Sequence, residues 1–508
     1  MRSLLSTIRT PVNAMQSNTL MLTGVLSFLP ASRHLSLMCS AGSHGYHALK
    51  EMMHNGKPGN TLLLESDNNT YNNIGDAESI GSYSLVYTFH ADSTLSAFKA
   101  EQVLRRKEPY SEHIPPTVTH IHAYWDTPMP PMCLLDGCSN LTTIDLHPLS
   151  PVTQLRGSFL AGCSGLTTID LSPLSGVTDV QWSFLSGCTG LTSIDLSPLS
   201  QVTEIQWSFL QGCSALTTID ISPLSQVTDI SESFLEGCSA LTTIDLTPLS
   251  QVRGVGRSFL KGCCNLEAID LTSLSKLERV RASFLEGCIS LTSIDLTPLS
   301  KVTEISFSFL AGCSGVKALD LSPLSQLIKI PTSFLEGCSG LTTINNLDAL
   351  SQVTQVSEAF LSGCTSLAAI DLTALSRLLI VGGSFLKGCS ALRMVNLQSL
   401  SKIRKISPSF LEGCSGLTAI DLGPLSQVAV VSGSFLKGCS GLTSIDLSPL
   451  SRVTILRPSF LEGCTSLKGI DLSPFINLTE IPDDLVVFCE KASIQFILPA
   501  HLIVKASR

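Results

Sequence analysis

Apolar and polar positions along this chain follow one pattern that returns every 25 residues. In the copy that begins at Cys163, Ile169 and Leu171 are apolar, whereas Thr168 and Asp170 are polar. This period-two alternation predicts a half-buried strand. A proline follows directly in ten of the fourteen copies, and we expect it to end the strand because proline cannot extend a hydrogen-bonded ladder.

The segment S-F-L-x-G-C closes each copy and is too short for a helix of three turns. It predicts a single helical or 3-10 turn, with the glycine in a tight turn. No single copy can bury its own apolar face, so the period predicts a solenoid whose stacked copies form the core. The phenylalanines are expected to form one buried stack that starts with Phe159, Phe184, Phe209 and Phe234.

The strand segment Leu166-Thr-Thr-Ile169-Asp-Leu171 resembles the L-x-x-L-x-L signature of leucine-rich repeats. The segment F-x-x-x-C, which ends in the repeat cysteine, resembles the corresponding segment of the BspA-like subclass of these repeats. This resemblance covers residues 113–500. It implies an α/β-type repeat solenoid: a right-handed array with a concave parallel β-sheet and short helical or 3-10 turns on the convex side. Such repeats bind many unrelated partners, so the resemblance implies a fold more than a function.

One aspartate recurs at the same place in the strand of most copies. By alternation this column points out of the concave sheet, where it is either solvated and hydrogen-bonded or a binding stripe for a basic peptide or divalent cations. Like charges on adjacent strands repel, so the column lowers the stability of the folded state. The candidate binding residues are Asp170, Asp195, Asp220, Asp245, Asp270, Asp295 and Asp320.

Two further features interrupt the regular pattern. Trp182 and Trp207 occupy equivalent positions in adjacent copies and are expected to lie side by side, either as an aromatic contact patch or packed on each other. Around Ile344 one copy has 26 residues. The extra residue predicts a bulge near a functional site, or a neutral insertion.

The ends of the chain differ from the array. Alternating apolar residues from Tyr83 to Phe89 predict a strand, and Phe496 falls where the aspartate column would continue. We expect a helical N-terminal segment at 1–50, a small mixed α/β capping region or linker at 51–112, the solenoid at 113–488 and a C-terminal cap at 489–508.

The first fifty residues allow several interpretations. Leu20–Leu29 could form the apolar core of a signal peptide, and Arg2 and Arg9 suit a mitochondrial presequence. The apolar spacing over residues 19–50 resembles an F-box, which implies docking on the adaptor of a ubiquitin ligase. A plain helical cap is the fourth interpretation.

Composition narrows the class of partner. The net charge of −9 over 508 residues argues against a nucleic-acid partner, and no run of about 18 apolar residues predicts a membrane span. Fifteen of the eighteen cysteines lie in the repeat column. We expect them to be buried and reduced, which favours a cytoplasmic protein, with mitochondrial and cell-surface or secreted locations as alternatives.

The residues that catalysis needs are scarce in the array. His147 is the one histidine inside the fourteen copies, so their many serines and aspartates lack a general base. His120 and His122 could share a strand face, but two ligands do not make a metal site. We therefore expect no enzyme, no cofactor and no metal, but a protein-interaction solenoid that recognises substrates for a ubiquitin ligase. The alternative is a BspA-like cell-surface adhesin or receptor.

Overall fold

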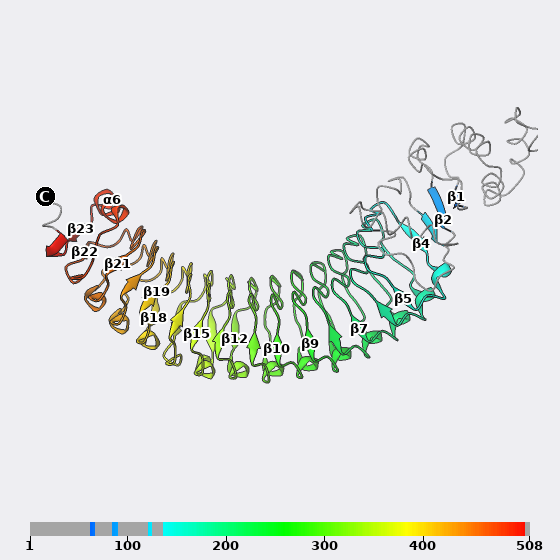
Figure 1. Ribbon diagram of the computed structural model, residues 1–508, viewed down its shortest axis with the longest axis horizontal. Helices are drawn as coiled ribbons and strands as arrows, with labels where there is room; N and C mark the ends of the chain where they lie inside the picture. Colours follow the sequence, from blue (N-terminus) through cyan, green and yellow to red (C-terminus); the bar gives the residue numbers. More distant parts are fainter. Residues whose placement is uncertain (1–60, 67–83, 90–119, 124–135, 503–508) are drawn as a thin grey trace, which may run out of the picture. The chain divides into compact units, whose positions relative to one another are not determined.

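The computed structural model describes residues 61–66, 84–89, 120–123 and 136–502, and the chain divides into two compact units, Met1–Gln226 and Val227–Arg508. In each unit the repeats are successive narrow coils of chain (Figure 1). The strand pairs among the described residues are parallel, as expected for stacked coils. Each unit is therefore a parallel solenoid.

The first unit opens with a parallel four-stranded sheet in the order β1-β2-β3-β4. Val86 pairs with His120, and Ile121 pairs with Ile144. The strand predicted at 83–89 is confirmed as β2. The bounds are β1 (Thr61–Ser66), β2 (Ser84–Phe89), β3 (His120–Ala123) and β4 (Thr143–Asp145).

The rest of the first unit alternates 3-10 helices with strands of two residues. Asp179 and Val180 of one copy pair with Gln154 and Leu155 of the copy before it. The elements are η3 (His147–Leu149), β5 (Gln154–Leu155), η4 (Ser172–Leu174), β6 (Asp179–Val180), η5 (Ser197–Leu199), β7 (Glu204–Ile205) and η6 (Ser222–Leu224).

The second unit continues the same alternation. Its 3-10 helices are η7 (Thr247–Leu249), η8 (Thr272–Leu274), η9 (Thr297–Leu299), η10 (Ser322–Leu324), η11 (Leu347–Leu350), η12 (Gln398–Leu400), η13 (Gly423–Leu425) and η14 (Ser448–Leu450). Its two-residue strands are β8 (Asp229–Ile230), β9 (Gly254–Val255), β10 (Arg279–Val280), β11 (Glu304–Ile305), β13 (Lys329–Ile330), β15 (Gln355–Val356), β17 (Ile380–Val381), β19 (Lys405–Ile406), β20 (Val430–Val431) and β21 (Ile455–Leu456). Its three-residue strands are β12 (Ala318–Asp320), β14 (Thr343–Asn345), β16 (Ala369–Asp371), β18 (Met394–Asn396) and β22 (Gly469–Asp471).

The strand predicted at Leu166–Leu171 is not regular. Leu166 donates its N–H to Cys163 O in the same copy, and Ser172 donates its N–H to the Asp170 carboxylate. Local turns therefore take donors that a regular ladder would use. The copies still align in parallel here, because Thr192 N–H reaches Thr167 O at 3.0 Å.

The predicted helical turn is also misplaced. The 3-10 helices follow the aspartate at Ser/Thr-Pro-Leu, where proline's fixed φ suits a first helical position. The S-F-L-x-G segment is instead an irregular turn with left-handed residues such as Ser283 (φ 60°), Leu285 (φ 55°) and Gly287 (φ 76°). Phe284 lies between two of them and faces the core, where 1% of its surface is exposed.

Inter-repeat hydrogen bonds hold these turns in place. Ser283 N–H donates to Phe307 O of the next copy, whereas Leu285 N–H donates to Phe259 O of the previous one. In this left-handed turn, the N–H groups of Ser283 and Leu285 therefore point in opposite directions along the stack. A left-handed non-glycine residue costs roughly 1–2 kcal/mol, and these bonds offset that cost at Ser283 and Leu285.

Phenylalanines and cysteines fill the interior, as predicted. Successive phenylalanine rings stack with centroids 6.3 Å apart in the first unit and 5.4–6.3 Å apart in the second. Cys188 and Cys213 have no exposed surface. The Cys188 thiol donates to Leu160 O at 3.1 Å, and the same bond recurs through the column. Each cysteine that makes this bond donates to the buried carbonyl of a left-handed leucine.

The C-terminal end closes with helix α6 (Asp483–Ala492) and strand β23 (Gln495–Ile497) beside β22. Ile497 pairs with Asp471, so Ile497 and not Phe496 continues the aspartate column. The added helix shifts the register by one residue and places Phe496 beside Ile470. No helix among the described residues is long and apolar enough to cross a membrane.

Candidate functional site

The aspartate column begins the 3-10 helices. Asp195 Oδ1 accepts the N–H of Ser197 at 2.8 Å, and Asp220 Oδ1 accepts that of Ser222 at 2.8 Å. Asn396 makes the same bond to Gln398 at 3.1 Å. The pattern is an Asx turn that satisfies the first free donor of each helix. It recurs before 3-10 helices at Asp170, Asp245, Asp270, Asp295, Asp320, Asp421 and Asp446. Asp371 and Asp471 make the same bond where a turn follows instead of a 3-10 helix.

These carboxylates are exposed. Hydrogen bonds from the backbone and hydroxyl of Ser222 lower the pKa of Asp220, although the neighbouring charge of Asp195 opposes this. The pKa of Asp270 is lowered by the Thr272 hydroxyl and then by its N–H. At Asp220, hydrogen bonding to the charged form therefore outweighs like-charge repulsion from Asp195.

In the second unit, the column falls at the ends of three-residue strands, such as Asp320 at the end of β12 and Asp371 at the end of β16. Asp-x-Ser/Thr-Pro is itself an Asx-turn signal, so the capping role was readable from the sequence.

The tryptophan pair is a stacked platform in the first unit. The rings of Trp182 and Trp207 lie parallel, with centroids 4.8 Å apart and planes 4° apart. The prediction that they lie side by side is therefore confirmed. A Cβ on Gly157 would clash with Cε2 of Trp182. Trp182 therefore packs flat on Gly157, a contact that the sequence analysis missed. Trp207 keeps 46% of its surface exposed.

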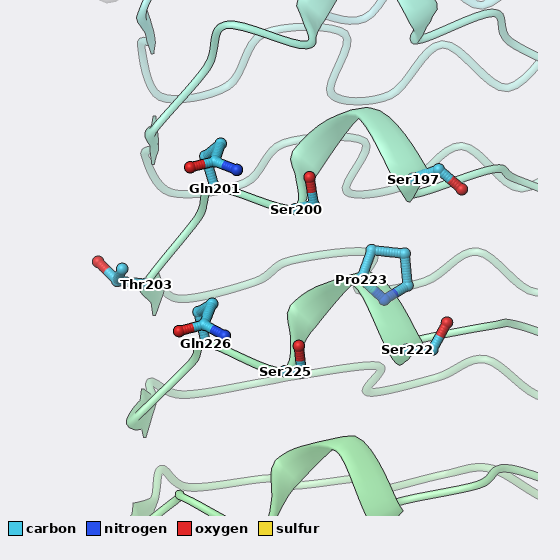
Figure 2. Close-up of a pocket in the computed structure, with 8 residues that line it drawn as sticks. All are labelled: Ser197, Ser200, Gln201, Thr203, Ser222, Pro223, Ser225 and Gln226. Atoms are coloured by element: carbon cyan, nitrogen blue, oxygen red, sulfur yellow. The ribbon is translucent and has the colours of Figure 1, made fainter.

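An open groove lies between η5 and η6 of the first unit. Its volume is about 550 Å³. Figure 2 shows equivalent serines and glutamines of the two copies side by side along it. None of the lining residues is titratable, so the groove offers hydrogen bonds but no acid, base or charged nucleophile. The lining is Ser197, Ser200, Gln201, Thr203, Ser222, Pro223, Ser225 and Gln226.

The 26-residue copy does not bulge within its strand. Strand β14 pairs in register with β12, and Asn345 lies opposite Asp320. The extra residue is Asn346, which follows the strand with a left-handed φ of 53°. Its Nδ2 donates to Asp320 Oδ1 at 2.9 Å, which binds the insertion to the preceding copy.

The described residues contain no group of three or more His, Cys, Asp or Glu side chains placed to hold a metal ion. His501 lies at the C-terminal cap, where a ring nitrogen is 2.8 Å from Leu478 O. His120 and His122 belong to strand β3, whose backbone pairs with β2 and β4. No candidate acid–base pair emerges from these described positions.

Comparison with known proteins gives one family. The family described as "BspA type Leucine rich repeat region (6 copies)" matches residues 132–267, 253–393, 339–468 and 380–502. No curated protein matches the chain.

Solved structures with leucine-rich repeats are similar to the chain at low identity. A Bacteroides ovatus leucine-rich repeat protein is 22% identical, with a TM-score of 0.38, over 63% of this chain and 88% of its own. A leucine rich cell surface protein from Faecalibacterium prausnitzii is 16% identical, with a TM-score of 0.27, over 86% of this chain and 83% of its own. The T. pallidum leucine-rich repeat protein is 16% identical, with a TM-score of 0.22, over 43% and 72%.

Proposed function

Because the chain belongs to the BspA-type leucine-rich repeat family, we propose that it is a non-enzymatic, surface-displayed scaffold that binds a basic segment of a partner protein. The family match carries this proposal. The F-box resemblance over 19–50 lies outside the described residues, and the family match begins at residue 132. A role in a ubiquitin ligase has no such support, so the alternative of the sequence analysis becomes the leading one.

The charge of the first unit favours a basic partner. Residues 136–226 contain no lysine and one arginine, Arg156. The acidic side chains over the same span are Asp136, Asp145, Asp170, Asp179, Asp195, Glu204 and Asp220. A field of one sign attracts and orients a partner of the other sign.

The tryptophan platform supplies a contact within that acidic field. Glu204 is exposed and lies three residues before Trp207, at the start of β7. A lysine or arginine over an exposed indole gains roughly 0.5–1 kcal/mol. Stacking on Trp182 holds Trp207 rigid, so binding does not have to order it.

The buried thiols do not oppose a surface location. The sixteen described cysteines are free, and fifteen of them are buried. Burial raises the pKa of Cys188 and of Cys288 to about 12. The thiolate is the form that oxidises, so protonated and inaccessible thiols persist outside a reducing compartment.

Anisotropy of a labelled peptide of alternating Arg and Ser, titrated with the full chain, tests the binding site. We expect Trp207→Ala to weaken binding about fivefold, which corresponds to roughly 1 kcal/mol, and added salt to weaken it further. The matched control is Phe307→Ala, which removes an aromatic ring, 49% exposed, from the equivalent position of a copy in the second unit.

Equal loss of affinity in the Trp207 and Phe307 variants would reject the tryptophan platform as the site. Location has a separate test. Intact cells labelled with a membrane-impermeant biotin reagent should yield biotinylated protein, and labelling only after lysis would contradict surface display.

A further inference from the structure

Exposed apolar side chains gather on, or directly before, two-residue strands in the middle of the second unit. Ile328 is 63% exposed, Leu379 58% and Ile380 54%. Leu379 and Ile380 are consecutive and both face solvent, where the preceding copy has Thr354 and Gln355. Ile380 pairs directly with Gln355 in the sheet. Two neighbouring positions that are polar in the preceding copy are therefore apolar in this one.

Several cations on the face that carries these apolar side chains have no acidic partner among the described residues. Earlier in this unit, Arg257 lies 3.7 Å from Glu232 and Arg279 lies 3.9 Å from Glu304, so that stretch neutralises itself. The later cations differ, because none makes an ion pair with any residue that the structure describes. They are Lys329, Arg404, Lys405 and Arg457, all exposed.

One carboxylate shares this face between residues 328 and 458, that of Glu358. The remaining positions on the strands are apolar or neutral, with Val430 and Ile455 half-buried. The basic–apolar face, defined as Ile328, Lys329, Leu379, Ile380, Arg404, Lys405, Val430, Ile455 and Arg457, is thus cationic and apolar at once.

The length of this face suits a short extended segment. It runs over the six strands β13, β15, β17, β19, β20 and β21. Stacked strands lie roughly 4.8 Å apart, which gives a strip of about 24 Å. An extended peptide rises about 3.3 Å per residue, so about seven residues span the strip. The basic side chains lie between the apolar ones along it.

We infer that the basic–apolar face is a second docking surface, whose occupant is an acidic protein segment that carries apolar side chains. Its carboxylates pair with the unpartnered lysines and arginines, and its apolar side chains cover Ile328, Leu379 and Ile380. Burial of this exposed apolar surface supplies affinity, and the charge pairs supply orientation. This surface is independent of the acidic tryptophan platform in the first unit and takes a partner of opposite charge.

The probe is a labelled octapeptide that alternates glutamate with leucine or phenylalanine, measured by anisotropy with the full chain. We expect binding that weakens as salt rises, because exposed charge pairs are screened. Leu379→Thr with Ile380→Gln converts one copy into the polar form of its neighbour and should reduce affinity about tenfold. Arg404→Thr with Lys405→Gln should reduce it similarly.

The matched control is Arg279→Gln, which removes a cation already paired with Glu304 on the same face and should leave peptide affinity unchanged. Thermal unfolding monitored by circular dichroism shows that each variant is folded. A peptide with lysine in place of glutamate, and one with serine in place of the apolar residues, should both bind more weakly.

Three outcomes would overturn the inference. The first is equal octapeptide affinity for the wild-type and both double variants. The second is binding to phosphatidylglycerol vesicles without binding to the octapeptide, which would make the face a lipid surface. The third is self-association, blocked by Lys405→Gln and by Glu204→Gln alike, without peptide binding. The tryptophan-platform experiment uses the oppositely charged peptide, so either proposal can fail alone.

Discussion

At the scale of single residues, the aspartate column is explained by backbone geometry. Each carboxylate accepts the N–H two residues ahead, and Asn396 can do the same. The lowered pKa of Asp270 means that the folded state prefers the charged form. A lowered folded pKa contributes stability that is present above the ordinary value of 3.8 and is lost as pH falls through the folded value.

Substitutions at Asp270 separate capping from charge. Asp270→Asn keeps an oxygen acceptor and should leave the thermal midpoint nearly unchanged at pH 7, whereas Asp270→Ala leaves the N–H of Thr272 without its side-chain acceptor and should lower it. Between pH 5 and pH 3, the wild-type should lose more stability than Asp270→Asn. An equal midpoint for the Ala and wild-type proteins at pH 7 would show that the turn needs no cap.

At the scale of the repeat, the period alone predicted the phenylalanine stack, the cysteine ladder and the parallel order of copies. All three features follow from the positions of the apolar residues, and the repeat spacing gives those positions. The left-handed Ser283 and Leu285 were not predictable in the same way, because inter-repeat bonds to Phe307 O and Phe259 O favour that conformation. Local preference opposes it.

Phe284 tests the energetic weight of the stack. Its ring lies between Phe259 and Phe309, with centroids 5.6 and 6.0 Å away. Truncation by Phe284→Ala should cost about 3–5 kcal/mol in chemical denaturation because it leaves a cavity. Phe307→Ala, at an exposed position in the next copy, should cost less than about 0.5 kcal/mol. A loss below about 1 kcal/mol for Phe284→Ala would contradict a close-packed stack.

At the scale of the whole molecule, buried ladders stabilise the array while the exposed columns vary from copy to copy. The candidate sites follow from that division. Trp182 and Trp207 were found from the sequence because tryptophan is rare in the chain. Leu379 and Ile380 were not, because an apolar residue in an apolar repeat is noticed only when the structure shows it exposed. Their signal was a departure from the Thr-Gln pair of the previous copy.

Thiol reactivity reports on the integrity of the entire array. The fifteen buried cysteines should react with an aromatic disulfide reagent only as fast as the units unfold, because burial blocks access to them. At Cys338 burial also raises the pKa of the thiol to about 12. Cys264 is half-buried and should react quickly. Cys264→Ser should therefore remove one equivalent from the fast phase, and denaturant should expose all eighteen thiols of the wild-type protein. Fast reaction of most thiols under native conditions would show that the copies open individually, contrary to a continuous ladder.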